Sequence, residues 1–465
     1  MFEIKMTDDM NVQGSLLENP HELIEFIFRK LMAASGFTIR ENQINLAKMM
    51  FDGIKYKHIA ICEAEVGTGK TYAYLVASLV YVLYEKQKRI KSGIFPYLDH
   101  ENCFIPCVIS TSSIDLQNAI IQSYVPILSD ILLKNKVIVH PISAVLRKGK
   151  EHYFCRMRYE RFLLYLKNSQ KPVDRELFYK LIIAKIPHRG IDLDEYKGLK
   201  NHIIQKINVP KACEISCPNY KECQYIKYMD YARSLVHDFQ VCNHNYYLAD
   251  TMKHSKAKHT LIPDHAIAII DEAHKLSDAA MQIFGTRFSS EHLTVMANVL
   301  KSSLKGNKAY LQTAKLKLES LCVLKTRFFT SLVSQINLDV VDDEASQLSI
   351  KIGNFEKVLL LDMLKVIESI REYCEVDISK NRSQEIMFSE ITEQIETFYR
   401  MENIIYWIEN PISENLVSIC CIPTDLDKQL HKVLWENGIP KILTSGTLSD
   451  DRGFSYFKVM PESIR

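Results

Sequence analysis

Short apolar runs separated by segments with helical spacing form the pattern of this chain. The runs are residues 58–63, 107–110, 137–141, 239–242, 266–270, 416–422 and 441–443. Residues 20–34 and 72–80 show the three- and four-residue apolar steps of helices, and residues 279–409 are largely helical in the same sense. Strands that alternate with helices predict an α/β fold with a parallel sheet. The pattern as a whole predicts that helical insertions interrupt this sheet twice.

Composition and charge limit the classes of protein to which this chain can belong. The chain has 465 residues and a formal net charge of +2, so any nucleic-acid surface must be a local patch. Residues 1–15 lack the apolar segment of a signal peptide, and the longest apolar run, residues 73–84, is too short to span a bilayer. We therefore expect a soluble, cytoplasmic protein with no membrane partner. Its 12 cysteines are then thiols or metal ligands rather than disulfides.

A phosphate-binding loop is predicted between the first strand and the helix that follows it. The sequence AEVGTGKT, residues 64–71, departs from the usual motif only in beginning with alanine. Two glycines allow consecutive backbone N–H groups to turn toward a phosphate chain, the lysine can reach the β- and γ-phosphates, and the last threonine can bind Mg²⁺. The residues expected to contact ATP and Mg²⁺ are Glu65, Val66, Gly67, Thr68, Gly69, Lys70 and Thr71.

Arg40 and Gln43 lie shortly before this loop and suggest an adenine contact. A glutamine amide offers a donor and an acceptor together, which match the N6 and N7 edge of adenine. The alternative is that Gln43 is solvated on an amphipathic helix.

Two adjacent carboxylates, Asp271 and Glu272, follow the apolar run 266–270 and begin the sequence Asp-Glu-Ala-His. Phosphoryl transfer to water needs one carboxylate to hold Mg²⁺ through its waters and a second to orient the attacking water. We expect these two residues and Lys70 to be catalytic, with the carboxylates on a strand beside the phosphate-binding loop. An acidic turn that caps a strand is the alternative, and it fits poorly with Lys70 and Thr71.

Two segments suggest contact with nucleic acid. Ser110 and Thr111 end a strand in a hydroxyl-rich turn, which either holds the phosphates of a nucleic-acid strand or caps the next helix. Residues 146–159 interleave basic and aromatic side chains, as do surfaces that bind single strands. A solvated charged face is the alternative for this second segment.

Four cysteines form a candidate metal site. Cys155 comes first, and Cys213, Cys217 and Cys223 follow much later with the spacing C-x3-C-x5-C. Thiolates gathered in this way can hold zinc or an iron–sulfur cluster. The spacing matches neither the zinc-ribbon nor the ferredoxin pattern. Zinc, an iron–sulfur cluster and unrelated buried thiols therefore all stay open on the spacing.

Taken in order, these motifs resemble the superfamily 2 DNA helicases of the iron–sulfur DinG/XPD type. The Gln43 element, EAEVGTGKT, STSSIDLQ, the four cysteines, Asn-His, DEAH and TSGTL match across residues 37–448. The resemblance implies a RecA-like motor domain and a 4Fe-4S cluster held by Cys155, Cys213, Cys217 and Cys223. It also implies that the motifs containing His274, Ser445 and Thr447 couple the state of ATP to strand binding. The implied activity is ATP-driven movement from 5′ to 3′ on single-stranded or forked DNA.

The same resemblance divides the chain into five parts. We expect residues 1–145 to be the first part of motor domain 1, 146–235 an iron–sulfur insertion, 236–280 the DEAH part of the motor, 281–415 a helical Arch-like insertion, and 416–465 the end of motor domain 1 and the start of a missing second one.

One departure separates the chain from this family. A second motor domain normally follows TSGTL and supplies arginine fingers from a Gln-x-x-Gly-Arg-x-x-Arg motif, yet the 465 residues contain no Gly-Arg dipeptide. Loss of such arginines can slow phosphoryl transfer by ~10³–10⁵. We therefore expect a truncated or split DNA helicase that needs a second polypeptide carrying motor domain 2. The alternatives are a nucleotide- and DNA-binding iron–sulfur module without motor activity, and a zinc-stabilised NTPase, which would leave TSGTL unexplained.

Overall fold

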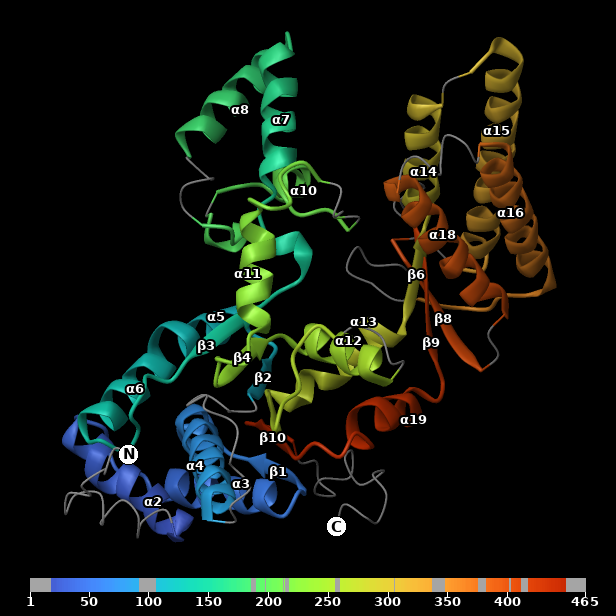
Figure 1. Ribbon diagram of the computed structural model, residues 1–465. Helices are drawn as coiled ribbons and strands as arrows, with labels where there is room; N and C mark the ends of the chain where they lie inside the picture. Colours follow the sequence, from blue (N-terminus) through green and yellow to red (C-terminus); the bar gives the residue numbers. More distant parts are fainter. Residues whose placement is uncertain are drawn as a thin grey trace. The chain divides into compact units, whose positions relative to one another are not determined.

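The computed structural model describes most of the chain (Figure 1). The described residues are 18–91, 106–184, 190–196, 198–211, 213, 217–255, 260–304, 306–336, 348–374, 382–400, 403–410 and 417–448. The expectation for residues 1–15 lies outside them. The chain forms two compact units: the first contains residues 1–209, 216–279 and 430–465, and the second contains residues 210–215 and 280–429.

The first unit is built on a six-stranded parallel sheet with the order β1-β10-β5-β2-β4-β3. Its strands are β1 (Ile59–Glu63), β2 (Cys107–Thr111), β3 (Ala144–Arg147), β4 (Phe239–Cys242), β5 (Ile267–Asp271) and β10 (Lys441–Ser445). Strands β2, β4, β5 and β10 are buried at every position, as expected for parallel strands with both faces covered. The predicted α/β fold with a parallel central sheet is therefore confirmed.

Helices cover this sheet. They are α2 (Pro20–Phe26), η1 (Ile27–Met32), α3 (Glu41–Lys55), α4 (Lys70–Lys91), α5 (Ile114–Ala119), η2 (Ile120–Tyr124), α6 (Val125–Lys134), α12 (His244–Ser255), η5 (Ala273–Lys275) and η7 (His431–Trp435). Helix α4 follows β1 and packs on α3, and residues 73–77 in its first turns are fully buried. This burial anchors the start of α4, because each large apolar side chain removed from water contributes about 1.5–3 kcal/mol.

The segment between β3 and β4 carries its own small core. Its helices are η3 (Lys150–His152), α7 (Arg156–Asn168), α8 (Pro172–Ile183), η4 (Leu193–Glu195), α10 (Asn201–Ile207) and α11 (Gln224–Arg233). Phe154, Tyr159 and Leu166 pack against Leu181 and Ile207 within it. The strand predicted at residues 137–141 is wrong: that stretch is irregular, and the sheet instead continues through β3 at residues 144–147.

The second unit is mixed rather than purely helical. Its helices are α14 (Ser290–Ser303), α15 (Lys308–Val333), α16 (Asn354–Tyr373), α18 (Arg382–Arg400) and the short α19 (Leu426–Leu430), with α13 (Leu276–Phe284) at the boundary. An antiparallel sheet of order β6-β9-β8-β7 accompanies them. Its strands are β6 (Thr286–Ser289), β7 (Leu348–Ile350), β8 (Ile404–Glu409) and β9 (Ser418–Pro423). The sequence boundary at residue 416 assigns β9 to the motor domain, whereas here β9 pairs with β6 and β8.

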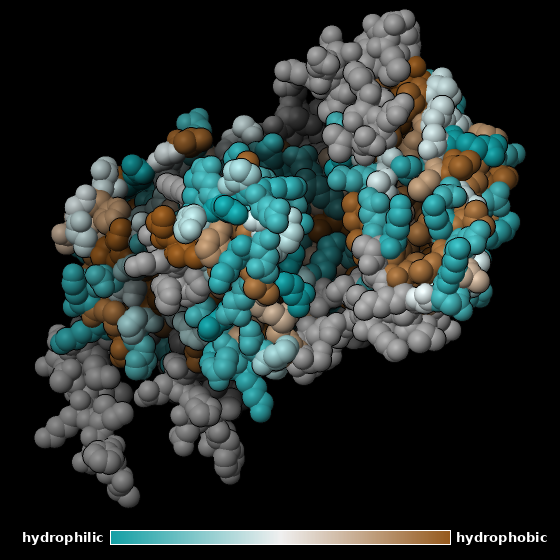
Figure 2. Space-filling model, turned by 90° about the horizontal axis from the view of Figure 1, so that it is seen from above, coloured by the Kyte–Doolittle hydropathy of each residue, from teal (hydrophilic) through white to brown (hydrophobic). Residues whose placement is uncertain are grey.

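On the face seen in Figure 2, hydrophobic residues are interspersed with hydrophilic ones. Within the described ranges, the search for a helix long and apolar enough to cross a bilayer finds none.

Candidate nucleotide site and its connections

The carboxyl ends of the six parallel strands bring the predicted motifs to one edge of the sheet. Glu63 of β1 lies opposite Ser445 of β10, and Thr444 lies opposite Asp271 of β5. Asp271 in turn lies opposite Thr111 of β2. Strand β10 therefore separates the strand of the phosphate-binding loop from that of the carboxylates, so the expectation that these two strands are direct neighbours is corrected. β10, the last strand among the described residues, completes the edge on which ligands of parallel α/β sheets bind.

The loop after β1 has the backbone that a phosphate cradle requires. Gly67 and Gly69 have φ values of 92° and 88°, a conformation that side chains other than glycine rarely adopt. Helix α4 begins at Lys70, so the positive end of its dipole faces the loop. Val66 is 92% exposed at the loop tip, and the amide of Thr68 donates to the carbonyl of Glu65 at 3.2 Å.

The Lys70 side chain folds back over the loop that precedes it. Its Nζ donates to the Ala64 carbonyl at 2.9 Å. A Cβ placed on Gly446 would lie 3.9 Å from this Nζ, so the loop after β10 reaches the lysine as well. The next residue, Thr71, lies in the first turn of α4 and contacts Tyr74.

Arg40 and Gln43 contact the phosphate-binding loop through its carbonyl groups. Arg40 Nη1 donates to Gly67 O at 2.7 Å, and Gln43 Nε2 donates to Gly69 O at 2.8 Å. Gln43 is only 6% exposed, so it is not the solvated glutamine that one interpretation expected. A cavity of about 270 Å³ beside it is lined by Arg40, Glu41, Asn42 and Thr68.

Asp271 is buried beside the start of α4. Its Oδ2 accepts a hydrogen bond from the Tyr74 hydroxyl at 3.1 Å, and the residue is 2% exposed. Burial, with the neighbouring charge of Glu272 as a second cause, raises the pKa of the Asp271 carboxyl to about 6. A buried carboxylate that is hard to ionise without a counter-charge suits a Mg²⁺ site, because the cation supplies that charge.

Glu272 and His274 meet the loop of Ser445. Glu272 has a φ of 54°, a left-handed conformation that is uncommon outside glycine and that turns its carboxylate toward β10. The Ser445 hydroxyl donates to Glu272 Oε2 at 3.2 Å and lies 2.7 Å from His274 Nδ1. The amide of Thr447 donates to the same hydroxyl oxygen at 3.3 Å. The structure thus brings together His274, Ser445 and Thr447.

Ser110 and Thr111 are fully buried at the end of β2. The N-cap role falls to Ser113, whose hydroxyl accepts from the amide of Leu116 at 3.2 Å. Ser110 Oγ instead lies 2.7 Å from Nδ1 of His244, a residue 134 positions away. His244 belongs to the Asn-His motif that follows a buried strand, but its contact with Ser110 was not predicted.

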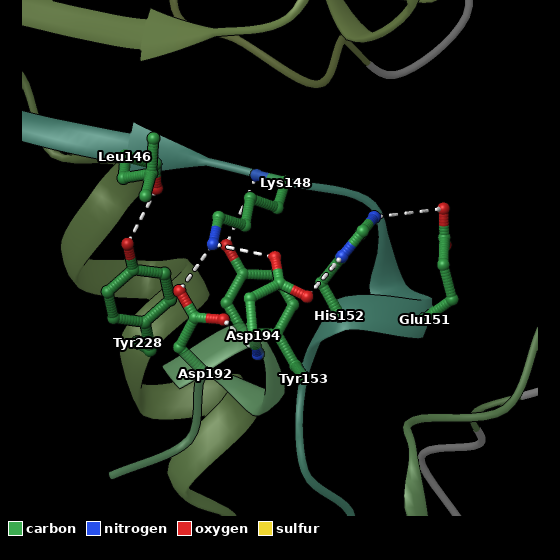
Figure 3. A network of polar contacts seen from close by, with 8 residues as sticks. All are labelled: Leu146, Lys148, Glu151, His152, Tyr153, Asp192, Asp194 and Tyr228. Atoms are coloured by element: carbon green, nitrogen blue, oxygen red, sulfur yellow. Dashed lines mark hydrogen bonds and ion pairs between the residues drawn. The ribbon is translucent and has the colours of Figure 1, made fainter. Parts of the chain in front are cut away.

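Part of the segment of basic and aromatic residues is internal: Lys148 and Tyr153 are buried within a network of polar contacts (Figure 3), whereas Lys150 and Arg156 are exposed. Arg147 is 1% exposed and donates to the carbonyl of Leu261. Lys148 Nζ donates to Asp192 at 2.6 Å and to Asp194 at 2.8 Å. The side chains of Arg147 and Lys148 therefore belong neither to a solvated face nor to an exposed surface that could bind a nucleic-acid strand. Instead, Lys148 joins the end of β3 to the inserted segment.

Tyrosines and a histidine extend this network. The Tyr228 hydroxyl of α11 donates to the Leu146 carbonyl at 2.6 Å, and Tyr153 accepts from the Lys148 amide at 3.2 Å. His152 Nδ1 lies 3.0 Å from Asp194 Oδ1. The hydrogen bond to His152, followed by the one to Lys148, lowers the pKa of Asp194 to about 2.

Three of the four predicted cluster ligands, Cys155, Cys217 and Cys223, lie in the first unit. Cys155 and Cys223 are the N-cap residues of α7 and α11, and the charge of Cys223 acts on the pKa of Cys155. Cys217 Sγ lies 3.8 Å from Met157 Sδ, two residues after Cys155. Cys213 is grouped with the second unit. Among the described residues, no set of three or more histidines, cysteines and carboxylates is placed to hold a metal ion.

Comparisons with known proteins identify relatives of this chain, although no protein-family model matches it. It is 28% identical over 299 residues to the ATP-dependent DNA helicase YoaA of Escherichia coli K12, a match that covers 63% of this chain and 40% of YoaA. The probable ATP-dependent helicase YpvA of Bacillus subtilis 168 is 22% identical over 451 residues, a match that covers 92% of this chain and 64% of YpvA. The ATP-dependent helicase DinG of Mycobacterium tuberculosis H37Rv is 24% identical over 285 residues, a match that covers 57% of this chain and 39% of DinG.

The chain thus spans between 39% and 64% of the length of these three relatives. Their names agree with the resemblance that the ordered motifs predict. The chain is accordingly a relative of the DinG-type ATP-dependent helicases.

Proposed function

We propose that this chain binds MgATP at the carboxyl edge of its parallel sheet and hydrolyses it in response to single-stranded DNA, as the motor part of a DinG-type helicase. One observation carries the proposal. The phosphate-binding loop after β1, the carboxylates after β5 and the Ser445 loop after β10 follow three adjacent strands. This is the set of groups that ATP hydrolysis needs in one place.

Each group has a distinct role in this proposal. Lys70 leaves the Ala64 carbonyl to bind the β- and γ-phosphates, and Thr71 and Asp271 hold Mg²⁺. Glu272 orients the attacking water and accepts its proton. Arg40, which lines the cavity beside the loop, and Gln43, which contacts Gly69, are assigned to the adenine. The bound cation favours ionised Asp271, which offsets the burial that raises its pKa.

We further propose that Cys155, Cys213, Cys217 and Cys223 hold a 4Fe-4S cluster. The support is the resemblance together with the proximity of Cys155 to Cys223 and of Cys217 to Met157. Two of the thiols, those of Cys155 and Cys223, lie at the N-termini of α7 and α11. Replacing Cys217 by Ser should lower the iron content of anaerobically purified protein and its visible absorbance. Full iron retention, or a colourless protein loaded with zinc, would contradict this assignment.

The same proposal includes movement from 5′ to 3′ on single-stranded or forked DNA. It also includes the need for a second motor domain. A nucleotide- and DNA-binding module without turnover is the second candidate. Only the motor requires Glu272, because binding alone needs no group to activate water.

ATP hydrolysis by anaerobically purified protein, with and without single-stranded DNA, separates the two candidates. Glu272→Gln is the matched control, since it keeps the shape of the side chain and removes the base. DNA-stimulated turnover that disappears in this variant would support the motor. Tight binding of ATP and DNA with no turnover in either protein would support the binding module instead.

A further inference from the structure

His244 occupies a buried position between two of the edge loops. It is the first residue of α12, directly after β4, and is 2% exposed. Because β4 pairs with β2, the imidazole reaches the end of β2, where Nδ1 lies 2.7 Å from Ser110 Oγ. Ser110 itself is fully buried, so this contact is shielded from water.

The other side of the same ring faces the carboxylate turn. Backbone groups of Glu272 and Asp271 lie against the imidazole, and the charge of His274 also acts on it. Burial lowers the pKa of His244 to about 4, so the ring is neutral at pH 7. Its Nε2 is buried and has no hydrogen-bond partner. The ring is therefore held by a hydrogen bond on the Ser110 side and by packing against the Glu272 and Asp271 backbone on the other.

The turn that His244 faces is strained. Glu272 has a φ of 54°, and a residue other than glycine held there stores about 1–3 kcal/mol. A small displacement of a packed neighbour can shift such a turn, because cores pass between discrete arrangements rather than deform smoothly. The loop after β2 is one such neighbour, joined to the turn through His244.

We propose that His244 is a positioning residue that transmits movement of the loop after Ser110 to the backbone of Glu272, and so links strand binding to the orientation of the carboxylate that activates water. This inference rests on the proposed function. His244 does not touch substrate, since it is buried among protein groups. It acts through Ser110 on one side and through the Glu272 peptide on the other.

The test compares His244→Asn, Ser110→Ala and the double variant with wild type. Asparagine can replace the Nδ1 contact but lacks the far half of the imidazole ring, so the packing against the Glu272 backbone is lost. We expect the ratio of DNA-stimulated to basal ATP turnover to fall about 10- to 100-fold in each single variant, the usual effect of misplacing a catalytic group. MgATP affinity should change less than about twofold, because both residues lie outside the phosphate-binding loop. The double variant should show no further loss, and additive losses would refute the link.

Tyr247→Phe is the matched control. Tyr247 is fully buried on the same helix, and its hydroxyl has no partner, so this change perturbs α12 without touching the link. It should leave the stimulation ratio unchanged. An equal fall in Tyr247→Phe and His244→Asn would show that general loosening of α12 is responsible, and would overturn the role of His244.

Hydrogen exchange of residues 272–275 on addition of oligo(dT) separates this inference from the proposed function. A DNA-dependent change in wild type that is lost in His244→Asn supports the link even if turnover is absent and the motor proposal fails. DNA-stimulated turnover that is equal in wild type and His244→Asn refutes the link alone. A wild type with neither DNA-stimulated turnover nor DNA-dependent exchange refutes both.

Discussion

Gly67 and Gly69 offer a matched pair of substitutions in one loop. Both have positive φ, so alanine at either position should cost roughly 1–2 kcal/mol of backbone strain. They differ in their surroundings. A Cβ on Gly67 would meet nothing within 4 Å, whereas a Cβ on Gly69 would lie 2.1 Å from Gln43 Nε2. Gly69→Ala must therefore also displace Gln43 and break its 2.8 Å hydrogen bond to Gly69 O, a further ~0.5–1.5 kcal/mol.

The expected loss in the free energy of unfolding is therefore about 1–2 kcal/mol for Gly67→Ala and about 1.5–3.5 kcal/mol for Gly69→Ala. Tryptophan fluorescence during urea unfolding, without nucleotide, can measure this difference. The chain has two tryptophans, of which Trp435 belongs to the first unit and Trp407 to the second. A Trp407→Phe background leaves Trp435 as the only tryptophan and so confines the signal to the unit that contains the loop.

A third substitution tests the cause. In a Gln43→Ala background no side chain blocks the added Cβ, so Gly69→Ala should then cost no more than Gly67→Ala. Equal losses for the two glycine variants when Gln43 is present would refute the argument that the Gln43 side chain sets the difference. So would a Gly69→Ala loss that stays the same after Gln43 is removed.

Three further perturbations have defined directions. Lys148→Met should cost about 3 kcal/mol, because it removes the ammonium group that pairs with both Asp192 and Asp194 in a partly buried site and leaves Asp194 with His152 alone. Asp271→Asn should stabilise the nucleotide-free protein at pH 7 by up to about 3 kcal/mol. Because the pKa of Asp271 is raised on folding, its contribution to the free energy of unfolding is fully present below about pH 4 and is lost as the pH rises through about 6. Glu356→Ala should cost about 1–2 kcal/mol, because it removes the carboxylate that accepts from the Gly353 amide at the start of α16.

Each of these has a measurement that can contradict it. Lys148→Met should be partly rescued by adding Asp192→Asn and Asp194→Asn, and an undiminished loss would mean that the ion pairs are not the cause. The advantage of Asp271→Asn should shrink as unfolding is repeated toward pH 4, and a constant difference would exclude ionisation as its origin. The Glu356 loss should appear in the signal of Trp407, which shares its unit, rather than in that of Trp435.

Local patterns predicted the elements around the nucleotide site well. The apolar runs before Lys70 and Asp271 are β1 and β5, and the segment that begins with Lys70 is helix α4. These elements combine strong periodicity with a motif whose chemistry requires a strand end or a helix start. Non-local pairing escaped prediction, because nothing in residues 441–445 shows that this strand lies between β1 and β5.

Short or polar elements account for the other differences. Strands β6 and β7 have four and three residues, too few for a period-two pattern, so the sheet of the second unit was not foreseen. Arg147 ends β3 as a buried cation, and its charge disguised the strand. At the candidate site, the contacts of Gln43 with Gly69 and of His244 with Ser110 join residues 26 and 134 positions apart, a relation that only the fold creates.

The place of β10 also bears on how the first unit assembles during synthesis. β1 has β10 as its only partner in the described sheet, so β1 stays unpaired until residues 441–445 have been made. At ~5–20 residues per second, the roughly 380 residues between Ile59 and Lys441 take about 20–75 s to synthesise. During that time the apolar strand ahead of the phosphate-binding loop has an open edge, available to chaperones or to another nascent chain. A ribosome-bound chain arrested before residue 441 should accordingly expose β1 to protease, and one released after residue 448 should protect it.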